Sequence, residues 1–170
     1  SNNQKKLEML VKKITPENIN NILKKSIILE EATNSEIDFL SIDIDSYDLD
    51  VWEALEKYRP KIVVIEINSS IEPGVIQRHD LKNQGNSFSA TVEVGKKKGY
   101  ILVCHTGNCI FLRDDLKNKI NYEKNLLNNP DILFDKSWLN KKDSILKKIF
   151  RSMMPILIID FMRKIKRKLF

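Results

Sequence analysis

The chain has 170 residues, of which 42% are hydrophobic, so one folded domain is expected rather than a disordered chain. Residues 1–4 are polar and show no secretory signal pattern, and two cysteines do not make a disulfide framework, so we expect a cytoplasmic protein. The net charge of +6 is uneven: from Lys136 onward eleven Lys and Arg face two Asp, which gives this segment +9 and the rest of the chain −3.

The N-terminal part of the chain predicts two helices. Apolar residues recur at helical spacing from Leu7 to Ile14, which indicates a first helix. A second helix is predicted to begin at Thr15-Pro16-Glu17, where Thr caps, Pro occupies the first helical position and an acid lies in the first turn. Its buried residues would be Ile19, Ile22 and Leu23.

A strand, a helix and a second strand follow. Residues 37–45 are a short, mostly apolar, β-prone run, and 61–68 are the clearest strand of the chain. Between them, 48–58 has a helical pattern with Val51, Leu55 and Trp52 on its buried side, and Arg59-Pro60 ends it. This order predicts a right-handed unit of two parallel strands joined by a helix.

The next elements end in a hairpin. Residues 69–86 form a polar loop long enough to close over a substrate, and Ser87 caps a helix that runs to about Lys98. Residues 100–104 and 109–112 read as two strands joined by a tight turn. Residues 116–143 indicate short helices and loops.

Several of these segments resemble the second half of FkbM-like methyltransferases, which are often found in bacterial surface-glycan gene sets. The similar segments are Ile-Asp-Phe-Leu-Ser-Ile-Asp-Ile-Asp-Ser-Tyr-Asp at 37–48 and Arg-Pro-Lys-Ile-Val-Val-Ile-Glu-Ile-Asn at 59–68. Residues 15–20 and the hairpin end at 107–115 are also similar, so the resemblance covers about residues 14–116.

The resemblance implies a fold and a cofactor. The expected fold is α/β: a partial, mostly parallel Rossmann-like methyltransferase sheet with a terminal antiparallel hairpin, helices on both faces and a C-terminal helical tail. The family binds S-adenosylmethionine over a glycine-rich turn after its first strand. No two of the five glycines form a G-x-G, and the first three strands are not found. We therefore expect the domain to be incomplete without an upstream cofactor-binding half.

The expected domain organisation has three parts: a partial methyltransferase-like domain at 1–116, a connection at 117–143 and a basic amphipathic tail at 144–170. If the sheet begins at 37–45, this apolar strand lies at an edge, which is a template for aggregation. The N-terminal helices, a second copy in a homo-oligomer, or an upstream domain would cover it.

Polar residues at the ends of the two parallel strands form the candidate site. Hard oxygen ligands suit Mg²⁺, and the arrangement is similar to that of metal-dependent catechol-type methyltransferases. A metal site, a crevice without metal, and a purely structural role as helix cap and strand end all remain open. The candidate metal ligands are Asp43, Asp45, Glu66 and Asn68.

Roles can be assigned within this crevice. Asp45 is the candidate catalytic residue, and His79 is a candidate general base or an ordinary loop histidine. The remaining candidates are Asp43, Ser46 and Tyr47 for the cofactor, and Asp48, Glu66 and Asn68 for the substrate.

The basic tail has an apolar face flanked by Lys and Arg. Such a helix lies on an anionic membrane surface or packs on the protein body, whereas nucleic acid is disfavoured because aromatic and basic residues do not alternate on a strand. The uninterrupted apolar run is too short to span a bilayer. The candidate membrane residues are Lys147, Lys148, Arg151, Arg163, Lys164, Lys166, Arg167 and Lys168.

Two functions follow from these patterns. The first, which the resemblance implies, is O-methylation of a sugar or glycan precursor with S-adenosylmethionine, peripherally at the inner face of the membrane. The second is a truncated, non-catalytic remnant that serves as a partner-binding or membrane-attached module. A strand followed by G-x-G in an upstream reading frame would favour the first.

Overall fold

The computed structural model describes residues 7–31 and 36–139. The chain divides into two compact units, residues 1–139 and 140–170. The second unit, which carries the basic tail and every candidate membrane residue, lies outside the described residues. No helix within the described ranges is long and apolar enough to cross a membrane.

Two short helices open the described chain, α1 (Ile19–Lys24) and α2 (Ile27–Glu31). The predicted helix at 7–14 is wrong, because these residues have no regular secondary structure. Eight residues with few contacts do not form a stable helix by themselves. Instead the Glu8 carboxylate accepts hydrogen bonds from Ser26 Oγ (2.6 Å) and from the backbone N–H of Ile27 (3.2 Å), at the start of α2.

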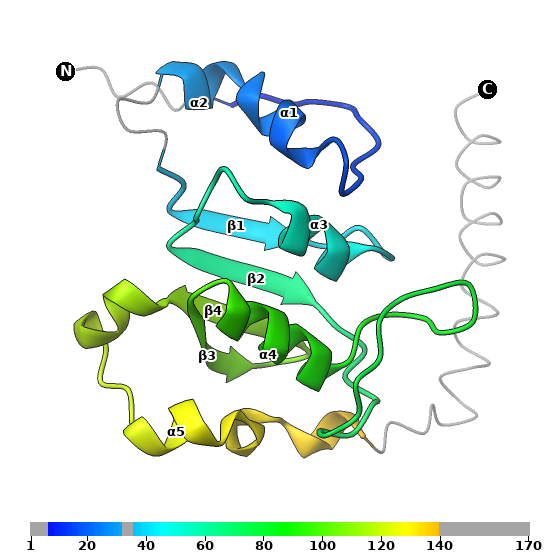
Figure 1. Cartoon of the computed structure of the whole chain (residues 1–170), viewed down its shortest axis with the longest axis vertical. Helices are drawn as coiled ribbons and strands as arrows, with labels where there is room; N and C mark the ends of the chain where they lie inside the picture. Colours follow the sequence, from blue (N-terminus) through cyan, green and yellow to red (C-terminus); the bar gives the residue numbers. More distant parts are fainter. Residues whose placement is uncertain (1–6, 32–35, 140–170) are drawn as a thin grey trace, which may run out of the picture. The chain divides into compact units, whose positions relative to one another are not determined.

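Four strands form one sheet in the order β1-β2-β4-β3 (Figure 1). They are β1 (Phe39–Ile42), β2 (Ile62–Glu66), β3 (Tyr100–His105) and β4 (Asn108–Arg113). The β1–β2 pair is parallel, and β4 runs antiparallel to both β2 and β3. This confirms the predicted partial α/β sheet with its terminal antiparallel hairpin, although one strand pair is parallel and two are antiparallel where a mostly parallel sheet is expected. β1 lies at the edge of this sheet.

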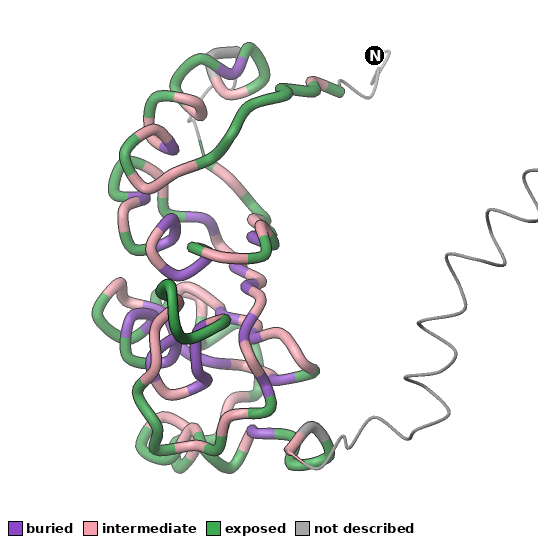
Figure 2. The backbone as a smooth tube through the Cα atoms, turned by 90° about the vertical axis from the view of Figure 1, so that its right-hand side faces the viewer, coloured by how far each residue is buried: buried purple, intermediate pink, exposed green. Residues whose placement is uncertain are grey.

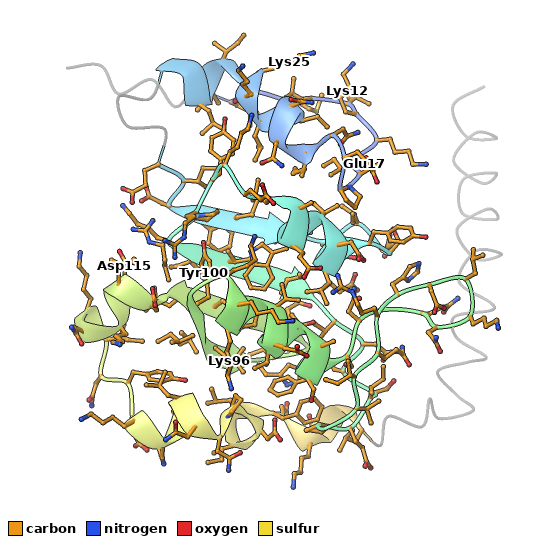
Figure 3. All side chains as sticks on the ribbon, viewed as in Figure 1. Lys12, Glu17, Lys25, Lys96, Tyr100 and Asp115 are labelled. Atoms are coloured by element: carbon orange, nitrogen blue, oxygen red, sulfur yellow. The ribbon has the colours of Figure 1, made fainter. Side chains whose placement is uncertain are left out.

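The helices α3 (Asp48–Ala54) and α4 (Phe88–Lys97) lie on the same side of the sheet (Figures 1 and 2). Trp52 of α3, only 1% exposed, meets the rings of Tyr100 and Phe111 at centroid distances of 5.6 and 4.9 Å. Burying such aromatic rings supplies much of the hydrophobic stabilisation of a small core. Figure 3 labels Tyr100, which is 3% exposed, and Lys96 of α4, which is exposed.

The opposite side of the sheet, which we call the open face, is also apolar. The strand register places Phe39, Ile62, Leu112 and Ile101 in one row, and Ser41, Val64 and Ile110 in the next. Phe39 is 56% exposed, and the other apolar members are half-buried except for Ile101. Among the described residues, the helices α3 and α4 both lie on the side of the sheet opposite the open face (Figure 2).

The chain after the sheet forms short turns of helix, as the sequence predicts. They are η1 (Asp114–Lys119), α5 (Lys124–Asn128), η2 (Pro130–Leu133) and η3 (Lys136–Trp138). Phe134, between the last two, is 5% exposed and joins the core around Phe88. This residue anchors the segment to the body of the first unit.

Candidate functional site

Three carboxylates converge where the two parallel strands end. Asp43 and Asp45 follow β1, and Glu66 is the last residue of β2. One side-chain oxygen from each lies within 4.8 Å of the others. The two aspartates are exposed and Glu66 is half-buried, so the cluster is open to solvent on one side. We call these three residues the carboxylate cluster.

Several negative charges lie close together in the carboxylate cluster. Burial raises the pKa of Glu66 above its ordinary value, and the nearby charges of Asp43, Asp48 and Asp45 add to the rise. Like charges this close disfavour the ionised form. A proton, a cation or a hydroxyl donor placed between these oxygens would relieve the repulsion.

The turn that presents Asp45 is built around Asp48. The Asp48 carboxylate is almost fully buried and accepts hydrogen bonds from the backbone N–H of Ile44 (2.8 Å) and of Ser46 (3.0 Å). Asp45 itself has a φ of 60°, in the left-handed region that Asp and Asn tolerate better than most residues. Asp48 therefore shapes the turn, and its contact with a substrate stays a prediction.

The Asn68 side chain forms hydrogen bonds within the loop that follows β2. Its amide nitrogen donates to the Gln84 carbonyl (3.0 Å), and its oxygen accepts from the Ser70 backbone N–H (3.1 Å). Gly85 packs against Asn68, because a Cβ atom added at Gly85 would lie only 3.0 Å from the Asn68 Cβ. Gly85 also has a φ of 74°, in the left-handed region. The structure thus gives the amide of Asn68 a role in closing this loop.

His79 packs against Tyr47, and their ring centroids lie 4.9 Å apart at an angle of 72°. This contact places both rings beside the turn that carries Asp45. The Nδ1 atom of His79 accepts a hydrogen bond from the Gly85 backbone N–H (3.2 Å). In the neutral ring the proton therefore lies on Nε2, and a role as general base would require this bond to break.

Two further side chains, Arg78 and Ser87, fix the loop through contacts that spacing in the sequence does not signal. Arg78 bridges to α3 through Asp50 (2.8 Å) and Glu53 (2.7 Å). The Ser87 hydroxyl caps α4 as predicted by accepting from the Ala90 N–H, and it also accepts a hydrogen bond from the Gln77 N–H in the loop. The loop is thereby held along α3, next to the carboxylate cluster.

The carboxylate cluster can bind a Mg²⁺ ion or hydroxyl groups, but it does not provide the glycine-rich turn that S-adenosylmethionine needs. Three carboxylates match the ligand preference of Mg²⁺ and can accept hydrogen bonds from sugar hydroxyls. S-adenosylmethionine needs a close backbone approach at a glycine-rich turn, and none of the glycines at 74, 85, 95, 99 and 107 follows β1 or β2 directly. The described residues therefore do not form a complete site for that cofactor.

Comparison with known proteins assigns the family. Residues 11–102 match the family described as methyltransferase FkbM domain, which is more than half of the chain. No curated protein and no solved structure gives a significant match. The matched range contains β1, α3, β2, α4 and the carboxylate cluster at the strand ends. The chain therefore belongs to the FkbM methyltransferase family.

Proposed function

We propose that this chain forms the acceptor side of an S-adenosylmethionine-dependent methyltransferase that O-methylates a sugar of a surface glycan. The observation that carries the proposal is the carboxylate cluster at the ends of two parallel strands, inside the range that matches the FkbM family. In open α/β sheets, ligands bind in the crevice at the carboxyl ends of the strands.

In this proposal the carboxylates bind and orient the acceptor. Asp43 and Asp45, which are exposed, accept hydrogen bonds from sugar hydroxyls, and Glu66, whose pKa burial raises, takes up the proton that the reacting hydroxyl loses. Positioning the hydroxyl supplies the larger part of the rate enhancement. A Mg²⁺ ion held by Asp43, Asp45 and Glu66 would acidify the hydroxyl and remove the charge repulsion.

The binding site for the methyl donor would come from a segment that completes the sheet. Two observations support this. Among the residues that the structure describes, β1 pairs with one neighbour, β2, and its Phe39 is 56% exposed. The open face carries the half-buried Ile62, Val64 and Leu112. A glycine-rich strand–turn–helix segment that pairs with β1 would cover both features at once.

The test is methyl transfer from labelled S-adenosylmethionine to a glycan fraction, by the chain joined to such a segment. Asp45→Asn keeps a residue that tolerates a φ of 60° and removes the charge, so activity should fall by about tenfold or more. Asp38→Asn, at the opposite end of β1 and 82% exposed at its side chain, is the matched control and should retain activity. Equal activity of the two variants would rule out the cluster as the reaction site.

The alternative is a non-catalytic module. It is favoured by the absence of a G-x-G from the whole sequence. If the joined protein binds no S-adenosylmethionine and transfers no methyl group, this alternative stands.

The basic tail is proposed to attach the protein to an anionic membrane surface. Its eight candidate membrane residues all lie after residue 146, where each Lys or Arg near anionic lipid adds about 1 kcal/mol. Co-sedimentation with vesicles containing phosphatidylglycerol should fall when residues 144–170 are removed. Equal binding to neutral vesicles would contradict an electrostatic attachment.

A further inference from the structure

A buried histidine joins three segments that are far apart in the sequence. His105, the last residue of β3, is 4% exposed. Its Nε2 lies 2.9 Å from Ser69 Oγ, in the loop after β2, and its Nδ1 lies 3.0 Å from the backbone nitrogen of Asp135. The sequence places His105 in the hairpin turn and gives no sign of either contact.

The hydrogen-bond partners determine where the proton lies. The Asp135 N–H can only donate, so Nδ1 must be the unprotonated nitrogen and Nε2 carries the proton. Nε2 then donates to Ser69 Oγ, and the Ser69 hydroxyl donates in turn to the Gly107 carbonyl at 2.7 Å. This direction excludes a nucleophilic Ser–His pair, in which the imidazole would accept from the hydroxyl.

The surroundings of the ring favour the neutral form. Phe134 stacks on it at 4.6 Å with an interplanar angle of 9°, and Phe88 of α4 meets it edge-on at 5.5 Å. Burial lowers the pKa of His105, and the Asp135 carboxylate, the charged group that faces it, acts in the opposite direction. Cys109, opposite it on β4, is a buried thiol whose pKa burial raises, so it brings no charge.

The two segments bonded to His105 are also the two walls of a cavity of about 590 Å³. Glu72 and Pro73, just after Ser69, line one wall. The other wall comes from residues 129–139, including Phe134, whose ring stacks on the imidazole. A cavity of this size can hold a small organic ligand.

We propose that His105 is a proton-sensitive latch that positions both walls of this cavity. A second proton on the ring must sit on Nδ1, where it would face the Asp135 N–H, so protonation breaks that bond and loosens residues 135–139, while the buried Phe134 stays in the core. The Ser69 bond is kept, because Nε2 donates in both states. The latch does not depend on methyl transfer.

The sign of the pH effect follows from the direction of the pKa shift. Because the native pKa is lowered below the ordinary value of 6.5, the latch is complete above that value. It weakens as the pH falls from about 6.5 through the native pKa, since the unfolded or released state then binds the proton more tightly.

Nuclear magnetic resonance of the full chain tests the proposal. At pH 8, the imidazole nitrogens of His105 should show the Nε2–H tautomer. Exchange protection of the Asp135 amide, corrected for the intrinsic rate, should fall by about tenfold as the pH is lowered towards 5, which corresponds to one net hydrogen bond. The Nδ1–H tautomer in the wild type, or pH-independent protection of this amide, would overturn the latch.

Three variants separate the latch from general unfolding. His79→Gln removes the other histidine of the chain and should leave the pH effect on Asp135 unchanged. His105→Gln cannot titrate and should lose both the protection and its pH dependence. Ser69→Ala should loosen residues 69–72 while the Asp135 amide stays pH-dependent. Loss of the pH effect in His79→Gln would contradict the assignment to His105, and the wild-type tautomer decides the question if His105→Gln does not fold.

Discussion

Asp48 belongs to the same short motif as Asp43 and Asp45, yet it is 3% exposed and they are exposed. From the sequence, all three are equivalent carboxylates between a strand and a helix. What separates them is the turn: Asp48 points back and binds two backbone N–H groups, while the left-handed Asp45 is presented to solvent. Which carboxylate is buried depends on backbone dihedrals that residue spacing does not encode.

Removal of Asp48 should therefore cost stability. Asp48→Ala leaves the N–H groups of Ile44 and Ser46 without their partner, and the free energy of unfolding should fall by about 1–3 kcal/mol. Urea denaturation followed by circular dichroism measures this change. Asp43→Ala, which removes an exposed carboxylate of the same motif, serves as the control and should change stability far less. Equal losses would contradict the role given to Asp48.

Replacement of Glu66 should raise the stability of the protein, in contrast to replacement of Asp48. Because its native pKa is raised, the stability that goes with protonated Glu66 is complete below its ordinary value of 4.5 and is lost as the pH rises through the native pKa. Glu66→Gln should therefore melt at a higher temperature than the wild type at pH 7, and the difference should shrink below pH 4.5. Thermal melts across this range test it, with Glu56→Gln as a control for loss of an exposed charge. A lower melting temperature at pH 7 would contradict the repulsion argument.

At the scale of elements, α3 is shorter than its sequence pattern predicts. The pattern extends to Tyr58, but the helix ends at Ala54 because other segments bind its terminal carbonyls. Asn20 Nδ2 donates to the Ala54 carbonyl (2.7 Å), and Lys98 Nζ donates to the Leu55 carbonyl (2.9 Å). These donors come from distant parts of the chain, which is why local propensity alone misses the end of the helix.

The packing of α4 on β4 depends on a glycine. A Cβ at Gly95 would lie 2.5 Å from Cε1 of Phe111, whose ring is 1% exposed and cannot move aside. Gly95→Ala should therefore lower the free energy of unfolding by about 1–3 kcal/mol, although alanine is the better helix former. Lys96→Ala, on the exposed neighbouring position, isolates the propensity effect. Stabilisation by Gly95→Ala in chemical denaturation would show that α4 is not packed this closely.

At the scale of the molecule, the sequence predicts the strands, their order along the chain and the hairpin, because these follow from short apolar runs and turn residues. It also places the carboxylate cluster, since the ends of parallel strands meet at one edge. It does not reveal the His105 latch or the Arg78 bridge, because both join residues separated by long stretches of chain. Pairings of this kind depend on tertiary packing rather than on local pattern.

The architecture of the sheet is compatible both with membership of the FkbM methyltransferase family and with the lack of a glycine-rich turn after β1 or β2. In the described part of the chain β1 has one strand partner and the open face is apolar, so a further segment would find both an edge and a surface to pack on. We propose that this chain carries the acceptor side of the reaction and that the donor site needs that segment.

Calorimetric titration of the full chain with S-adenosylmethionine, with and without Mg²⁺, tests this claim most directly. We expect no binding at roughly millimolar cofactor for the chain alone, and micromolar binding once the glycine-rich segment is joined to it. Micromolar binding by the chain alone would contradict the claim, because other residues would then replace the glycine turn.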